Sequence, residues 1–205
     1  MNNGNNIPKA IVMLIVGLVV GLAIGYPIGH SHAKSNNTNT VSQQAPANSN
    51  GVMVGGAEMV DTKNIVANAL NANNVTTLVK AVQAAGLVDT LESSGPFTVF
   101  APNNSAFAKL PSATLNSLLQ PANKAELVKI LTYHVVSGTY TNAALTVMAE
   151  KGQTLTSVEG ETITPVMVNN QLELKDAQGN LVTIQTPDVI SSNGVTFVIN
   201  SVLMP

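Results

Sequence analysis

The fold is decided largely by one stretch, residues 95–107, which reads GPFTVFAPNNSAF. Gly95-Pro96 breaks the chain, and the β-branched and aromatic residues that follow predict a strand. Pro102 ends this strand, and Asn103 or Asn104 can cap the helical turn that carries Phe107. Two further stretches have the same mixture of apolar and polar residues: 131–136 (LTYHVV) and 193–205 (NGVTFVINSVLMP).

Outward from this stretch, the period of the apolar residues changes along the chain. The first half is helical, with expected helices at 65–72 (capped by Asn64), 75–85 (capped by Asn74 and stopped by Gly86), 113–119 and 124–133. The second half alternates and contains turn residues, with expected strands at 153–157, 161–168, 171–176, 181–185 and 195–199. Helices followed by short antiparallel strands indicate an α+β fold.

The three quoted stretches, in this order and spacing, resemble the two conserved blocks and the central Tyr-His pair of the fasciclin (FAS1) domain family. The resemblance covers residues 60–205. It implies a FAS1-like fold, in which helices pack on a wedge of mainly antiparallel strands. It also implies extracellular adhesion and matrix contact without catalytic activity, and a binding role for Tyr133 and His134. Two positions depart from the family pattern, since Asn200 stands where Asp is usual and Phe197 where His is common.

His134 is expected to be buried. Leu127, Ile130, Leu131 and His134 follow one another at i, i+3, i+4 and i+7 and so share one helix face. Burial lowers a histidine pKa and leaves a neutral ring that needs a hydrogen-bond acceptor for its N–H. We therefore expect a structural His134 and a Tyr133 anchored through its hydroxyl. The alternative, a hydrolase or metalloenzyme built on His134, lacks a G-x-S-x-G motif and clustered metal ligands.

Composition excludes several classes of function. The chain has no cysteine, and its nine basic residues are all lysines, without arginine and without a basic cluster. Disulfides and Cys-ligated metals are therefore excluded, and neither nucleic acid nor a cofactor is expected. Glu159 and Glu161 flank Gly160, in what we expect to be a solvated turn rather than an acid–base pair. Thr98, Asn103, Asn193, Asn200 and Ser201 are expected to form the polar framework of the core.

Residues 10–29 form an apolar run long enough to cross a bilayer as a helix. Two readings stay open for residues 1–33: an uncleaved signal anchor, or a signal peptide cleaved after Ala33. Residues 34–57 are rich in Asn, Ser and Gly and predict a flexible tether, followed by the domain at 58–205. The membrane helix also has glycines at every fourth position, which permit self-association: Gly17, Gly21, Gly25 and Gly29. Asn-x-Ser/Thr sequons begin at Asn36, Asn74 and Asn103.

These observations predict an extracytoplasmic adhesion or matrix-binding module that is either tethered to the cell membrane or secreted. Its expected partner is a surface or matrix protein or a glycan. The alternative is a carrier or sensor that binds a small apolar ligand in a cleft between helices and strands. A large apolar pocket favours the alternative, whereas a filled core argues against it.

Overall fold

The computed structural model describes residues 51–205, and the expected membrane helix at 10–29 lies outside them. Within the described range, no helix is both long and apolar enough to cross a membrane. The helices are α1 (Ile65–Ala69), α2 (Thr76–Ala85), α3 (Val88–Glu92), α4 (Asn104–Ala108), α5 (Ser112–Leu118), η1 (Pro121–Asn123), α6 (Lys124–Tyr133) and α7 (Asn142–Glu150). The strands are β1 (Val52–Val54), β2 (Ala57–Met59), β3 (Phe97–Pro102), β4 (Val135–Ser137), β5 (Leu155–Thr156), β6 (Thr162–Val168), β7 (Gln171–Lys175), β8 (Leu181–Ser191) and β9 (Gly194–Ile199).

The main sheet is mixed and has the strand order β4-β3-β9-β8-β7-β6-β5. Strands β3 and β9 are parallel, with Phe97 opposite Gly194 and Pro102 opposite Ile199. The other pairs of neighbours are antiparallel. The expectation of a mainly antiparallel sheet is therefore confirmed, with one parallel pair that brings the strand of residues 97–102 against the C-terminal strand.

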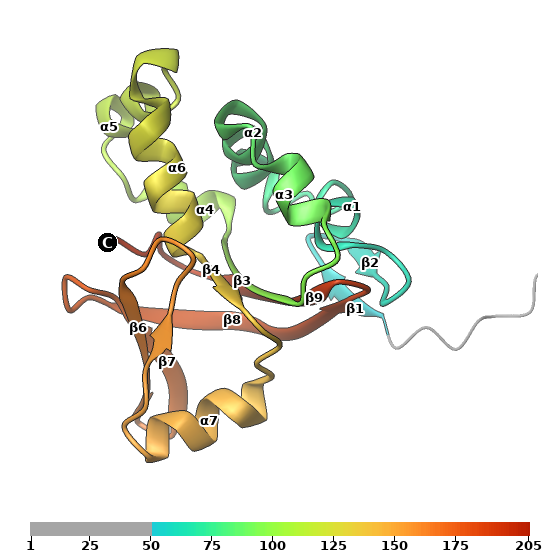
Figure 1. Ribbon diagram of the computed structural model, residues 1–205, viewed down its shortest axis with the longest axis vertical. Coiled ribbons are helices and arrows are strands. Elements are labelled where there is room, and N and C mark those ends of the chain that lie inside the picture. The colour runs from blue at the N-terminus through green and yellow to red at the C-terminus, as the bar shows by residue number, and fades with distance from the viewer. Residues whose placement is uncertain (1–50) are drawn as a thin grey trace, which may run out of the picture. The chain divides into compact units, whose positions relative to one another are not determined.

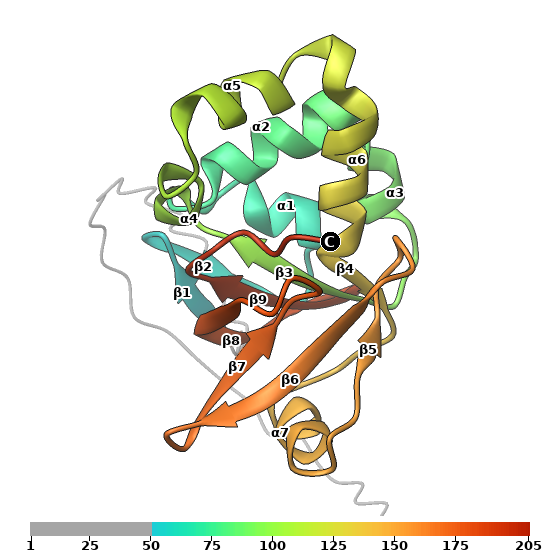
Figure 2. The ribbon, with the colours of Figure 1, turned by 90° about the vertical axis from the view of Figure 1, so that its left-hand side faces the viewer.

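The two ends of this strand order meet. Val136 of β4 forms an isolated antiparallel bridge with Ser157, just beyond β5, and Val158 donates its N–H to the carbonyl of Val135 at 2.7 Å. Figure 2 shows β4 and β5 side by side. Since the end strands bond to each other, the sheet offers little unpaired edge to which a partner strand could be added.

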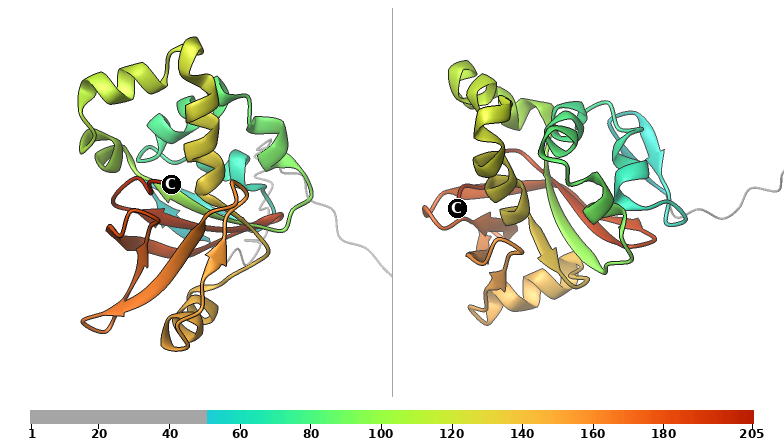
Figure 3. Two further views of the ribbon diagram at one scale, coloured as in Figure 1. Left: turned by 60° about the vertical axis from the view of Figure 1, so that its left-hand side comes forward. Right: turned by 45° about the horizontal axis from the view of Figure 1, so that its top comes forward.

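Helices cover both faces of the sheet, as Figures 1 and 3 show, with α1 to α6 on one side and α7 on the other. Successive residues of β3 point to opposite faces. Val99 and Ala101 belong to the core cluster formed with α1 to α6. Phe100 belongs to the second cluster, where its ring centroid is 5.7 Å from that of Phe197. Phe197, which replaces the histidine common in the family, therefore fills the core with an apolar ring.

Several elements were not expected from the sequence. Strands β1 and β2 form a hairpin within residues 52–59, so regular structure begins inside the segment predicted to be a tether. Strand β4 and helix α7 lie between the expected helix at 124–133 and the expected strand at 153–157. In α7 the apolar residues are mostly small or only half-buried, and Leu145 is the one residue of the helix that is buried. The apolar periodicity that would predict this helix from the sequence is therefore weak.

The expected cap of α2 was wrong. Asn74 makes no capping bond, and the side-chain oxygen of Asn104 instead accepts the N–H of Thr77 at 3.0 Å. Asn104 also donates its side-chain amide to the carbonyl of Asn73 at 3.0 Å. A residue of α4 thus closes the start of a helix that lies 27 positions earlier. By contrast, Asn64 and Asn103 cap α1 and α4 as expected.

Candidate functional site

Tyr133 and His134 lie together at the C-terminal end of α6, where the helix meets β4. Their side chains are 0% and 2% exposed, so the expected burial of His134 is confirmed. Neither ring reaches the surface of the folded domain. A partner that approaches this pair therefore meets the residues around it, and the pair itself positions those residues.

Both nitrogens of the His134 ring are bonded to the backbone. Nδ1 lies 2.8 Å from the carbonyl oxygen of Ile130, and Nε2 accepts the N–H of Leu203 at 3.0 Å. The carbonyl requires a proton on Nδ1 and the Leu203 N–H requires a bare Nε2, so the ring is the neutral Nδ1-H tautomer. Burial lowers the pKa of His134 to about 4, against partial opposition from the Ile130 hydrogen bond and the charge of Asp176.

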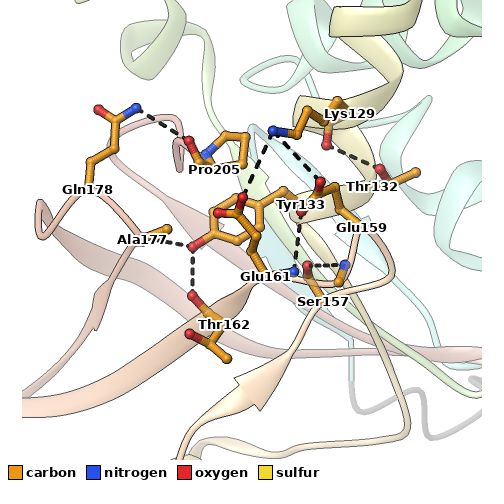
Figure 4. A network of polar contacts seen from close by, with 11 residues as sticks. Lys129, Thr132, Tyr133, Ser157, Glu159, Glu161, Thr162, Ala177, Gln178 and Pro205 are labelled. Carbon is orange, nitrogen blue, oxygen red and sulfur yellow. Dashed lines mark hydrogen bonds and ion pairs between the residues drawn. The ribbon is translucent and has the colours of Figure 1, made fainter.

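The Tyr133 hydroxyl links α6 to the start of β6 and to the turn that follows β7. It donates to the carbonyl of Thr162 at 2.8 Å and accepts the N–H of Ala177 at 2.8 Å (Figure 4). Burial raises the pKa of Tyr133 to about 12, which keeps the phenol protonated as a donor. This geometry is the hydroxyl anchoring that the sequence predicts for Tyr133.

A small charged surface lies near Tyr133 (Figure 4). Lys129, one turn before Tyr133 on α6, lies 3.8 Å from a Glu159 carboxylate oxygen and 3.9 Å from one of Glu161. The two glutamates follow β5 in a turn, as expected, and they face the lysine rather than each other (Figure 4). We call Lys129, Val158, Glu159 and Glu161 the α6 face; Val158 is 48% exposed beside the glutamates.

The surroundings of His134 do not prepare it for acid–base catalysis. A general base needs an unoccupied nitrogen within reach of a proton to be abstracted, and the only basic nitrogen of the ring already accepts from Leu203. Among residues 51–205, no group of three or more His, Asp or Glu side chains is placed to hold a metal ion. The hydrolase alternative therefore has no favourable geometry at this ring.

The expected polar framework is divided between four places, the last of which is the start of the C-terminal tail. Asn193 links the β8–β9 turn to α1 and α3, while Thr98 donates to the carbonyl of Gly138 at 2.7 Å and accepts the N–H of Tyr140 at 2.9 Å. Asn103 caps α4 and donates its side-chain amide to Gln185. The sequon nitrogen of Asn103 is therefore hydrogen-bonded within a side chain that is only 9% exposed.

Asn200 and Ser201 hold the start of the C-terminal tail. The Asn200 side-chain oxygen accepts the N–H of Thr183 at 3.1 Å, so this residue keeps the acceptor of the aspartate usual in the family. The Lys109 ammonium donates to the Asn200 carbonyl at 2.7 Å and to the Ser201 hydroxyl at 3.1 Å. Packing and hydrogen bonding at this position thus do not require a charge.

An apolar cavity of about 120 Å³ lies between the helices and the sheet. Its walls come from α1, α2 and α3, and its floor comes from β3, β9 and the end of α6. Ile65, Val82 and Leu91 line the walls, and the His134 ring reaches the floor. Leu70, on the wall, is 58% exposed, so the cavity reaches the molecular surface there.

Two structural polar residues were missed by the sequence reasoning. Asp176 is 5% exposed and accepts N–H groups from Asn180 at 2.8 Å and from Met204 at 3.2 Å. Asn68 is 3% exposed and bonds to Val60 and Ser191. Asp176 begins the turn at residues 177–180, a position where aspartate commonly bonds its own backbone, so this signal was available. The partners of Asn68 are distant in sequence and leave no such pattern.

Comparisons with known proteins agree with this fold. A family model described as the fasciclin domain matches residues 73–205. Protein sll1483 of Synechocystis is 45% identical over 141 residues, which are 69% of this chain and 73% of that protein. The cell surface glycolipoprotein MPB83 of Mycobacterium bovis is 37% identical over 119 residues, which are 58% of this chain and 48% of MPB83.

A solved structure shows the same architecture. The FAS1 domain pair from the insect cell adhesion molecule Fasciclin I matches with a TM-score of 0.65 at 18% identity. The match covers 71% of this chain and 52% of the insect chain. At this identity the likeness shows the fold alone.

Proposed function

This chain belongs to the fasciclin domain family, and from that membership we propose that it is a non-enzymatic recognition module for adhesion or matrix contact outside the cytoplasm. The observation that carries the proposal is the family match over residues 73–205. The names of relatives support it, since MPB83 is named a cell surface protein and Fasciclin I a cell adhesion molecule. The partner is a surface or matrix protein or a glycan.

The α6 face is the part of the domain that we propose for this contact. The family resemblance points to Tyr133 and His134; both rings are buried, and Tyr133 lies one turn after Lys129 on α6. Val158 offers an exposed apolar side chain, and Lys129, Glu159 and Glu161 surround it with charges of both signs. A small site of this kind binds weakly on its own, and many copies on one surface raise the overall attachment.

Reversing the charge at Lys129 is expected to weaken attachment without unfolding the domain. In Lys129→Glu a third carboxylate replaces the one cation of the face, so a partner selected by this charge pattern loses roughly tenfold in affinity. Stability falls by about 1–2 kcal/mol and the domain stays folded, because the Glu159 side chain is only 15% exposed and meets a like charge in place of its cation. The measurement is attachment under flow of cells that display each variant. Lys151→Glu, an exposed charge reversal at the residue that follows α7, is the matched control; equal attachment of the two variants contradicts the proposed face.

Residues 10–29 are proposed to anchor the chain in the membrane, with residues 34–50 as the flexible part of the tether. Full-length protein is then expected in the membrane fraction, since an apolar segment of this length partitions into lipid. A chain that lacks residues 1–50 has lost both the anchor and the export signal, and is expected in the soluble fraction of the cell. Fractionation followed by mass spectrometry of the N-terminus distinguishes the two open readings. A mature chain that begins after Ala33 would replace the anchor by a cleaved signal peptide and make the protein secreted.

The second candidate function is carriage or sensing of a small apolar ligand. One observation favours it: the cavity between helices and sheet, at about 120 Å³, is lined almost entirely by apolar side chains. A core filled to the usual density of protein interiors would have argued against this function. The two functions are compatible, because none of the residues that line the cavity belongs to the α6 face.

A further inference from the structure

We infer that the cavity beside α1, α2 and α3 is a binding site for an uncharged apolar molecule, and that Glu92 at its rim disfavours organic anions. The inference rests on the second candidate function and names its site and the chemical class of its ligand. Three properties of the cavity support it: its size, its largely apolar lining, in which both nitrogens of the His134 ring are already bonded, and the charge at its rim.

The size of the cavity sets the size of the enclosed part of the ligand. An engineered apolar cavity of ~150 Å³ in another protein stays dry and binds benzene. A cavity of about 120 Å³ is therefore large enough for a single ring or a short branched chain. Leu70 is 58% exposed on the wall, so a longer molecule can extend past it toward solvent.

The imidazole of His134, on the floor of the cavity, cannot form a hydrogen bond with a ligand. The His134 ring is the largest polar side chain there, and both of its nitrogens are already bonded, to Ile130 and to Leu203. A polar ligand atom at this depth would lose its bonds to water without replacing them, at a cost of ~1–3 kcal/mol. The part of the ligand that lies against this ring must therefore be hydrocarbon.

The rim of the cavity selects against negative charge. Glu92, the last residue of α3, is the one charged residue among those that line the cavity, and its side chain is exposed. Like charges a few ångströms apart repel, by ~1 kcal/mol even in water. A carboxylate or sulfonate whose apolar part enters the cavity meets this charge, whereas an uncharged molecule does not.

The experiment uses the full-length chain in detergent and two fluorescent probes with related ring systems. N-phenyl-1-naphthylamine is uncharged, and 8-anilinonaphthalene-1-sulfonate carries one negative charge. The filling variant is Val82→Phe, whose added ring enters the cavity, and its matched control is Val147→Phe on α7, which is 44% exposed. The charge variant is Glu92→Lys, with the exposed Glu150→Lys as its control. Every variant carries the same apolar N-terminal segment and is measured at the same detergent concentration, so probe bound to the segment or to micelles cancels in each comparison between variants.

The expected results are specific for each arm. The uncharged probe binds the wild-type protein and Val147→Phe alike, and at least tenfold more weakly to Val82→Phe. The anionic probe binds the wild type several-fold more weakly than the uncharged one. Glu92→Lys restores anionic binding several-fold and leaves the uncharged probe within twofold, whereas Glu150→Lys changes neither.

Two different failures can be told apart. If the uncharged probe binds Val82→Phe as tightly as Val147→Phe, the cavity is not the site, and the carrier function falls with it. If the uncharged probe behaves as expected but Glu92→Lys leaves anionic binding unchanged, only the charge selection is overturned. Thermal unfolding followed by circular dichroism shows whether each variant is folded. Should Val82→Phe not fold, Val79→Phe, at a half-buried position of the same wall, provides the same comparison.

Discussion

Replacing Asn193 by alanine is expected to lower the free energy of unfolding by about 3–5 kcal/mol, since it removes several buried hydrogen bonds at once. The side-chain oxygen accepts the N–H of Ile65 at 3.0 Å, and the side-chain amide donates to the carbonyls of Leu91 and Ser93, each at 2.8 Å. Asn193 is 7% exposed, so alanine leaves these backbone groups without water to replace the lost partner. The three bonded segments are the start of α1, the end of α3 and the turn before β9.

Urea unfolding of the wild type, Asn193→Ala and Asn71→Ala measures this difference. Asn71 also donates its side-chain amide to a backbone carbonyl, that of Ala67, but the bond is exposed to solvent. Its loss should cost less than ~1 kcal/mol, because water replaces the partner. Equal destabilisation by the two substitutions would contradict the role given to Asn193. Because Ile65 and Leu91 also line the cavity, Asn193→Ala should in addition weaken binding of the uncharged probe.

Local signals predicted much of this fold correctly. Gly86 ends α2 in the left-handed conformation, at φ 73°, and Asn64 and Asn103 each accept a backbone N–H at the start of the helix they precede. Asn169 and Asn170, at φ 48° and 64°, form the expected two-residue hairpin. In each case the deciding interaction lies within a few residues, so the sequence pattern contains it.

Contacts between distant segments were beyond such signals. The cap of α2 comes from Asn104, 27 residues away, and β4 depends on its pairing with β3 more than on its own three residues. The burial of His134 followed from helical periodicity, but its bond to Leu203, 69 residues later, did not. The cavity could not be predicted from the sequence either, since it depends on how three helices and the end of a fourth pack over two strands.

The stability of the domain is expected to fall as the pH drops from about 6.5 to 4, because of His134. In the unfolded chain this ring binds a proton with a pKa of ~6.5, whereas in the folded domain burial lowers the pKa to about 4. Between these values the unfolded state binds more protons, so acid favours unfolding. Each unit of pKa difference corresponds to ~1.4 kcal/mol, which gives a loss of ~2 kcal/mol at pH 5 and ~3 kcal/mol at pH 4.

The comparison with His134→Gln separates this effect from the titration of carboxylates, which is common to both proteins. Glutamine carries an oxygen that can accept the Leu203 N–H but no group that titrates in this range. We expect the variant to be less stable at pH 7, where it loses the fit of the ring, and its stability to fall less steeply between pH 6.5 and 4. Parallel pH profiles from urea unfolding would show that His134 does not titrate as a buried neutral ring. If the profile of His134→Gln is flatter than that of the wild type, His134 is the source of the acid sensitivity. A proton taken up at Nε2 then replaces the hydrogen bond from the Leu203 N–H, and so weakens the attachment of the C-terminal tail to α6.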